Sequence, residues 1–386
     1  MIKNFAGKFW SFAFYFLYFA GAVAVFNYLA LYFQGQGLPG TQIGVLMGMM
    51  SMISLFSGPL WSALADAGQR HRLILSSAML GNLIAVFLFP FFNSFWWFLV
   101  LIIVGSGFAG PIQSMADNAT MTMLGDEKEL YGRVRIGGTI GWGIAAPIVG
   151  AVVARYGMRY NFSIYSVMFL IALIAAQQMH FSQHKSEGSY WSGVRGLLTD
   201  RNWIVFLVIV IIAASGSSAI NNYLFVYLQK IGTSPTWMGW AVTISTAVEV
   251  PALFFANRML KKLGARGLLL LGLASMALRC GLYGLVNVPW GALTIQLLQF
   301  VTFPILWVAG VSYADENAPA GMGATAQSIF NSAFMGIGSA AGGFFGGVLL
   351  QYLGVQNMFL TFGLVMLLAA LIFGVLQCRQ LASQLA

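Results

Sequence analysis

The sequence predicts an all-α membrane protein with 12 transmembrane helices in two six-helix, pseudo-symmetric bundles. Of its 386 residues, 59% are hydrophobic and only 8% are charged, whereas charged residues make up about a quarter of a soluble domain. The chain also divides into twelve apolar stretches, most of them near the roughly 20 residues that a helix needs to cross a bilayer. Finally, segments of the first half return in the second. These observations exclude a soluble globular fold.

The expected spans are separated by glycine, proline and polar or basic residues. They cover residues 9–33, 41–65, 73–92, 95–123, 133–154, 161–180, 202–229, 236–260, 267–286, 290–313, 322–350 and 357–378. The first stretch is too long for the apolar core of a signal peptide, and no small-residue cleavage site follows it, so we expect it to be retained.

Lys and Arg residues predict the orientation, because cytoplasmic loops carry an excess of them. On the side of the N-terminus lie Lys3, Lys8, Arg70, Arg72, Lys128, Arg133, Lys185, Arg195, Arg201, Arg258, Lys261, Lys262, Arg266 and Arg379. The opposite side has only Arg155, Arg159 and Lys230. We therefore expect both termini in the cytoplasm, and we attribute the net charge of +9 to this bias, not to a nucleic-acid partner.

Similar segments indicate an internal duplication. NYLALYFQ at 27–34 returns as NYLFVYLQ at 222–229, and GAVVARYGMRYNF at 150–162 returns as GVLLQYLGVQNMF at 347–359. Two parallel six-helix repeats are typical of a secondary transporter that binds its solute at the midplane between them and works by alternating access. The predicted parts are an N-terminal bundle (1–180), a cytoplasmic linker (181–201) and a C-terminal bundle (202–386).

Charged residues within spans are rare because each costs about 2.5–3.5 kcal/mol at the bilayer centre. Asp117 in the fourth span and Arg135 in the fifth are equally far from the loop that joins them, so they are expected at one depth. Glu249 and Arg279 are related in the same way about Gly264. Each pair has two interpretations: a structural ion pair that offsets its own burial, or a carboxylate and a forked donor for cargo hydroxyls or a cargo carboxylate.

Other polar and aromatic residues in spans are candidates for cargo contact. Trp142 lies roughly 10 Å deeper than Arg135 at ~1.5 Å per residue, where its ring could stack on a sugar, although an interface tryptophan is the alternative. Asn222 and Gln299 are candidate binding residues as well, with hydrogen bonds between helices as the alternative. The glycines at 137–141 and 338–347 are expected to let helices approach closely.

Enzymatic chemistry is not expected, because no histidine lies within a span, no metal-ligand spacing occurs and no nucleophile stands beside a base. We expect no cofactor and no metal. Cys280 and Cys378 both fall within spans, where a buried thiol usually serves packing.

Motifs resemble the major facilitator superfamily. SALADAGQRHR at 62–72 is similar to the loop between its second and third spans, which implies a cytoplasmic gating role for Asp66, Arg70 and Arg72. FWSFAFYFLYFAGA (9–22), SLFSGPLWSALAD (54–66) and YGRVRIGGTIGW (131–142) resemble the oligosaccharide-proton symporter branch, to which lactose permease belongs.

The resemblance implies roles for residues of both halves. In that branch a carboxylate eighteen residues before the arginine binds sugar with it, and a tryptophan seven residues after the arginine stacks on the ring; Asp117, Arg135 and Trp142 have this spacing. The second half, through AVEVPALFFANRMLKKLGARGLLLLG, is more similar to phenylpropionate permeases. The histidine and glutamate that couple protons in lactose permease correspond to Gln299 and Thr302, which cannot titrate.

The resemblance implies a monomeric transporter in a bacterial inner membrane that imports a small polar solute, above all a sugar, by proton symport. Proton coupling would then use Asp117 or Glu249, with Arg279 as a further coupling candidate, and without a titrating carboxylate the protein would be a uniporter. The alternatives are a permease for an aromatic carboxylate such as phenylpropionate and, less favoured, a drug/proton antiporter. APIVGA (146–151) keeps two of the four positions of the exporter motif.

Overall fold

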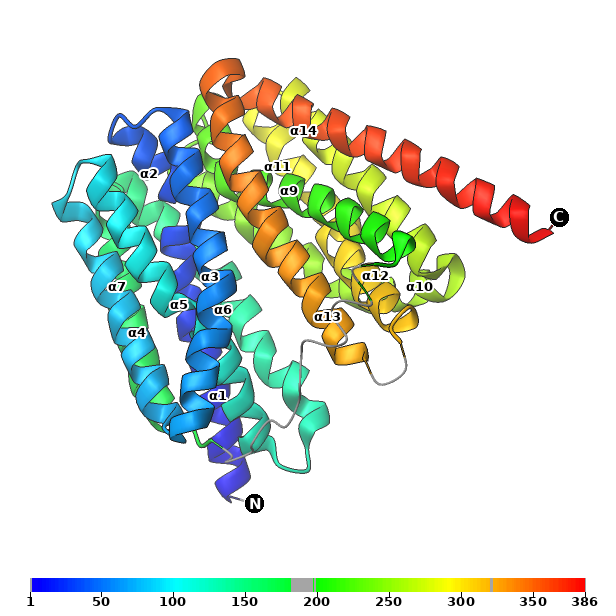
Figure 1. Cartoon of the computed structure of the whole chain (residues 1–386). Coiled ribbons are helices and arrows are strands. Elements are labelled where there is room, and N and C mark those ends of the chain that lie inside the picture. Colours follow the sequence, from blue (N-terminus) through cyan, green and yellow to red (C-terminus); the bar gives the residue numbers. More distant parts are fainter. Residues whose placement is uncertain (1, 182–196, 198, 320–321, 386) are drawn as a thin grey trace. The chain divides into compact units, whose positions relative to one another are not determined.

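The computed structural model describes residues 2–181, 197, 199–319 and 322–385, and the described chain is helical with short connections (Figure 1). The α-helices are α1 (Ile2–Phe26), α2 (Leu29–Gly35), α3 (Gly40–Gly68), α4 (His71–Leu88), α5 (Phe95–Leu124), α6 (Tyr131–Tyr156), α7 (Tyr160–Gln177), α9 (Arg201–Lys230), α10 (Pro235–Leu285), α11 (Pro289–Ile295), α12 (Phe303–Glu316), α13 (Gly323–Asn331) and α14 (Ser339–Leu385). Four short helices join them: η1 (Phe89–Phe91), η2 (Lys128–Leu130), η3 (Gln296–Val301) and the π-helical η4 (Ser332–Gly338).

Among the described residues, ten helical segments are long and apolar enough to cross a membrane. The predicted class, an all-α protein with many membrane-spanning helices, is therefore confirmed. The number of twelve and the arrangement in two bundles of six stay predictions.

The chain forms two compact units. Unit 1 comprises Met1–Leu38, Met49–Glu187 and Thr233–Thr243, and unit 2 comprises Pro39–Gly48, Gly188–Gly232 and Ile244–Ala386. Each unit thus includes a short segment from the other half of the sequence, at the start of α10 and of α3. The predicted boundaries at 180 and 202 stay a prediction, and most of the predicted linker 181–201 lies outside the described residues.

In unit 1, α1 packs along α6 and α7, and α4 packs against α5 and α7. The glycines of α6 make the first of these contacts close: a methyl group added at Gly137 would lie 2.8 Å from the carbonyl oxygen of Phe12, and one at Gly138 would lie 2.6 Å from the ring of Phe19. The predicted packing role of these glycines is confirmed, and it fixes the aromatic face of α1 against the helix that carries Arg135.

In unit 2, α14 packs against α9. A methyl group added at Gly342 would lie 2.7 Å from the Cβ atom of Ser218, and one at Gly343 would lie 2.9 Å from the backbone of Met47, so the second glycine run also serves close packing. The long helices α10 and α14 are each interrupted once, at Gly264 (φ 67°) and Gly354 (φ 78°). These left-handed conformations favour glycine, and the two parts of α14 are clearly angled in Figure 1.

Candidate functional site

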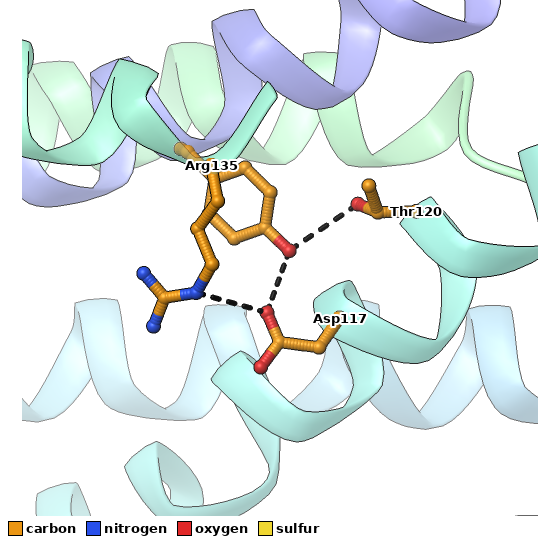
Figure 2. Close-up of polar contacts among 4 residues, drawn as sticks. Asp117, Thr120 and Arg135 are labelled. Carbon is orange, nitrogen blue, oxygen red and sulfur yellow. Dashed lines mark hydrogen bonds and ion pairs between the residues drawn. The ribbon is translucent and has the colours of Figure 1, made fainter. Parts of the chain in front are cut away.

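Asp117 and Arg135 meet in unit 1, across the hairpin of α5 and α6. Arg135 Nε lies 3.6 Å from Asp117 Oδ1, and each side chain keeps 31% of its surface exposed. The expectation that the two residues share a depth is confirmed. Because the carboxylate contacts Nε, the terminal guanidinium nitrogens are directed away from it, as Figure 2 shows.

A tyrosine of α1 completes the polar contacts of this pair. Tyr15 OH donates a 2.6 Å hydrogen bond to Asp117 Oδ1 and accepts one from the hydroxyl of Thr120 at 3.3 Å (Figure 2). The same carboxylate oxygen therefore holds both the phenol and the arginine. Asp117 Oδ2 holds neither of these two partners. The phenol of Tyr131, at the start of α6, also interacts with both Asp117 and Arg135.

Aromatic rings border the pair. The guanidinium carbon of Arg135 lies 5.5 Å from the ring centroid of Tyr15 and 5.7 Å from that of Phe19, distances at which a cation is attracted to the ring face. Phe19 in turn meets the ring of Trp142 edge-on at 6.3 Å. The structure thus connects all three residues of the predicted N-terminal set, Asp117, Arg135 and Trp142, through the aromatic face of α1.

Unit 2 contains a second polar cluster, around Arg279 on α10. This arginine is only 4% exposed. Its Nη1 donates to the side-chain oxygen of Gln299 and, at 3.3 Å, to the hydroxyl of Thr302, and its Nη2 donates to Gln296 at 2.9 Å. The guanidinium also lies 5.8 Å from the ring centroid of Tyr283. Neutral acceptors thus surround a buried cation.

Glu249 contacts this cluster through an amide and not through a direct ion pair with Arg279, which was one of the two interpretations of these residues. Gln299 Nε2 donates to Glu249 Oε2 at 3.2 Å, while the oxygen of the same amide accepts from Arg279. The physical reason is the geometry of η3, which places the side chain of Gln299 between the two charges. Whether this amide link takes part in proton coupling stays a prediction.

The remaining candidate residues lie outside these clusters. The amide of Asn222 donates to Ser218 Oγ on its own helix at 3.1 Å, so this bond is not the expected bond between helices, and a role of Asn222 in cargo binding stays a prediction. Arg72 Nη2 donates to the carbonyl oxygen of Met179 at 3.0 Å and so ties the start of α4 to the end of α7. Arg70 is exposed at the N-cap of α4, and the side chain of Asp66 lies outside the described set.

Metal-binding residues do not gather in the described part of the chain, where no group of three or more His, Cys, Asp or Glu could hold an ion. Cys280 is a free, fully buried thiol in α10, which agrees with the packing role expected for it.

Several residues of the two clusters were not predicted from the sequence, among them Tyr15 and Phe19 in unit 1, and Gln296 and Tyr283 in unit 2. A signal for the first two exists, because Tyr15 and Phe19 are four residues apart and therefore share one helix face. Tyr283 is likewise four residues after Arg279. Gln296 falls within the predicted span 290–313, but only the structure shows that it bonds the arginine.

This chain is similar to known proteins over most of its length. Residues 9–361 match the model of the MFS_1 like family. Maltose permease of Geobacillus stearothermophilus is 25% identical over 95% of this chain and 94% of its own, and the probable 3-phenylpropionic acid transporter of Escherichia coli (strain K12) is 25% identical over 92% and 93%. The crystal structure of nucleoside transporter NupG has a TM-score of 0.85 with 16% identity, covering 97% of this chain and 99% of that one.

Proposed function

Because the chain belongs to the MFS_1 like family of the major facilitator superfamily, we propose that it imports a small polar solute, and specifically a sugar, by proton-coupled symport with alternating access. It acts in this proposal as a monomer in a bacterial inner membrane, with both termini in the cytoplasm. The transporter class and the membrane location rest on the family and its relatives. The sugar, the proton and the orientation are the proposed part.

The proposal includes twelve spans in two bundles of six. The two interrupted helices, α10 with 51 residues and α14 with 47, would each be more than 70 Å long if straight, at about 1.5 Å per residue. A hydrocarbon core is about 30 Å thick. Each of these helices is therefore long enough for two spans joined at its glycine.

The observation that carries the sugar proposal is the Asp117–Arg135 pair with its aromatic border. A half-exposed carboxylate accepts hydrogen bonds from hydroxyl groups, and a guanidinium donates two in a fixed fork. Sugars present vicinal hydroxyls on a ring whose other face is apolar, so the flat side chains of Phe19 and Trp142 suit them. The similarity to a maltose permease favours the same class of cargo.

Coupling is proposed to use a carboxylate that exchanges a proton during transport. Asp117 is already bound by the guanidinium of Arg135 and the phenol of Tyr15. Glu249 receives only an amide donor in the described contacts and reaches Arg279 through it. We therefore propose that Glu249 is the residue that binds and releases the coupling proton, with Asp117 as the alternative.

A second candidate cargo is an aromatic carboxylate. It is favoured by Arg279, a buried cation that the described structure pairs with neutral acceptors instead of a direct carboxylate. A carboxylate could approach such a guanidinium in bidentate geometry. The similarity to a probable 3-phenylpropionic acid transporter also supports it.

Uptake into proteoliposomes separates these proposals. Purified protein is reconstituted, an inward proton gradient is imposed, and labelled maltose and labelled phenylpropionate are offered in turn. The sugar proposal predicts maltose accumulation that collapses with a protonophore and is not inhibited by phenylpropionate. Accumulation of phenylpropionate alone would contradict the sugar proposal and support the aromatic carboxylate as cargo. Maltose uptake that only equilibrates, whether or not a proton gradient is present, would refute proton coupling and indicate a uniporter.

A further inference from the structure

A cavity of about 240 Å³ lies in unit 1, apart from both polar clusters, where η1 meets the start of α7. It is lined by Phe87, Pro90, Phe91, Arg159, Tyr160, Phe162 and Ser163. The start of α2 adjoins the same place, because Tyr32 OH donates to the carbonyl oxygen of Phe89 at 3.3 Å and its ring centroid lies 4.8 Å from that of Phe162. The cavity therefore belongs to the end of unit 1 that the predicted topology places opposite the N-terminus.

The charge at this end is unusual. In the predicted topology, six connections face this side, and they contain three basic residues (Arg155, Arg159 and Lys230) but no Asp or Glu. Arg155 lies over the ring of Tyr156 at 5.4 Å, and Lys230 donates to Gln356 at 2.9 Å. Arg159 lines the cavity, and the loops of this side offer it no carboxylate. Arg159 is exposed, so a ligand in the cavity can reach its guanidinium.

The local backbone also favours an anion. Arg159 occupies the N-cap position of α7 without a capping hydrogen bond from its side chain, and the N-terminus of a helix attracts negative charge. Ser163 and Tyr160 add hydroxyl groups to the lining. A guanidinium, hydroxyl groups and a helix start together suit a phosphate group.

The helices beside the cavity expose apolar side chains. Ile84 and Phe87 on α4 are 55% and 47% exposed, Phe91 in η1 is 66% exposed, and Val167 and Leu170 on the adjoining α7 are 55% and 51% exposed. An acyl chain can lie along such a surface, whereas a soluble phosphate gains nothing from it. The combination distinguishes a lipid from a free anion.

We propose that this cavity binds the phosphate headgroup of an anionic phospholipid, with Arg159 as its charge partner and with the acyl chains along α4 and α7. The site is independent of the proposed transport function. It would hold a lipid of the leaflet opposite the N-terminus, at the one connection on that side that carries two arginines.

Native mass spectrometry of the full chain tests this, with phosphatidylglycerol, phosphatidylcholine and soluble glycerol 3-phosphate as probes. We expect wild type to prefer phosphatidylglycerol over phosphatidylcholine about tenfold, because both lipids carry a phosphate group but only phosphatidylcholine also carries a choline cation, which repels the guanidinium. R159Q should lose this preference, and R159K should keep part of it, because lysine retains the charge but not the fork. R155Q, four residues away on the same connection, is the matched control and should behave as wild type.

Three results would overturn the proposal. One is an unchanged lipid preference in R159Q, and another is an equal loss in R155Q and R159Q, which would indicate diffuse loop charge. The third is competition by glycerol 3-phosphate at the concentration of the lipid, which would assign the cavity to a soluble phosphate. Melting temperatures in phosphatidylcholine check folding. If R159Q does not fold, S163A replaces it, with a lowered preference expected and an unchanged one contradicting the site.

Discussion

The two polar clusters of this chain each contain one carboxylate and one arginine, but they are built differently. In unit 1, Asp117 and Arg135 touch directly and are each 31% exposed. In unit 2, Arg279 is 4% exposed and reaches Glu249 only through the amide of Gln299. An exposed pair can exchange its partner for a cargo at little cost, whereas a buried arginine depends on every acceptor around it. This difference is the reason for proposing cargo binding at the first cluster and coupling at the second.

The largest effect is expected at Arg135. R135A removes the forked donor and leaves Asp117 with the phenol of Tyr15, so uptake should fall on the order of a hundredfold, since charged hydrogen bonds contribute about 1.5–3 kcal/mol each. R135K, which keeps the charge without the fork, should fall less. Initial uptake rates in proteoliposomes measure both. Uptake by R135A at the wild-type rate would remove this pair from the site.

The next effect concerns coupling and should separate the two carboxylates. E249Q retains the hydrogen-bonding shape of Glu249 but carries no exchangeable proton, so accumulation against a gradient should fall about tenfold while exchange of cargo across the membrane continues. Counterflow and gradient-driven uptake are compared in the same vesicles. D117N is the matched variant, and it should impair both. The assignment fails if E249Q still accumulates cargo and D117N does not.

A smaller effect is expected on stability, at the amide link of unit 2. Q299L removes an acceptor from buried Arg279 and should cost about 1–3 kcal/mol, the penalty for leaving a buried polar group unsatisfied. Q299E supplies a carboxylate to the same guanidinium but places it against Glu249, to which the amide of Gln299 donates, so it should restore only part of this loss. Melting temperatures in one detergent report the effect. Equal values for wild type and Q299L would show that Arg279 does not need this acceptor.

The smallest effect is expected at Tyr15. Y15F removes the 2.6 Å hydrogen bond to Asp117 but leaves the ring beside Arg135, so the KM for cargo should rise roughly three- to tenfold with little change in kcat. Thr120→Val, which removes the donor to the phenol but not the phenol, should change KM less. A larger rise in KM in Thr120→Val than in Y15F would contradict the proposed importance of the hydrogen bond from Tyr15 to Asp117.

Some features of this molecule could be predicted from the sequence because a simple physical rule fixes them, and others could not. Charges in spans are rare, and a hairpin fixes depth, so Asp117 and Arg135 could be placed together from spacing alone. Glycine spacing likewise predicted a close helix contact at 137–141, but it did not predict that the partner is α1. The amide between Glu249 and Arg279 could not be predicted, because the turn of η3 decides which face Gln299 presents. Tyr15 was missed because an aromatic residue in an aromatic-rich helix gives no sign of a polar partner.

The most direct test of the central claim, that the Asp117–Arg135 pair holds the cargo, is a thermal-shift measurement on detergent-purified wild type and R135A. Sugars, nucleosides and aryl carboxylates are added at millimolar concentration, and a ligand at a hundred times its Kd stabilises the folded protein by about 2.7 kcal/mol. We predict a sugar that raises the melting temperature of wild type and leaves that of R135A unchanged. An equal shift in both proteins would contradict the claim.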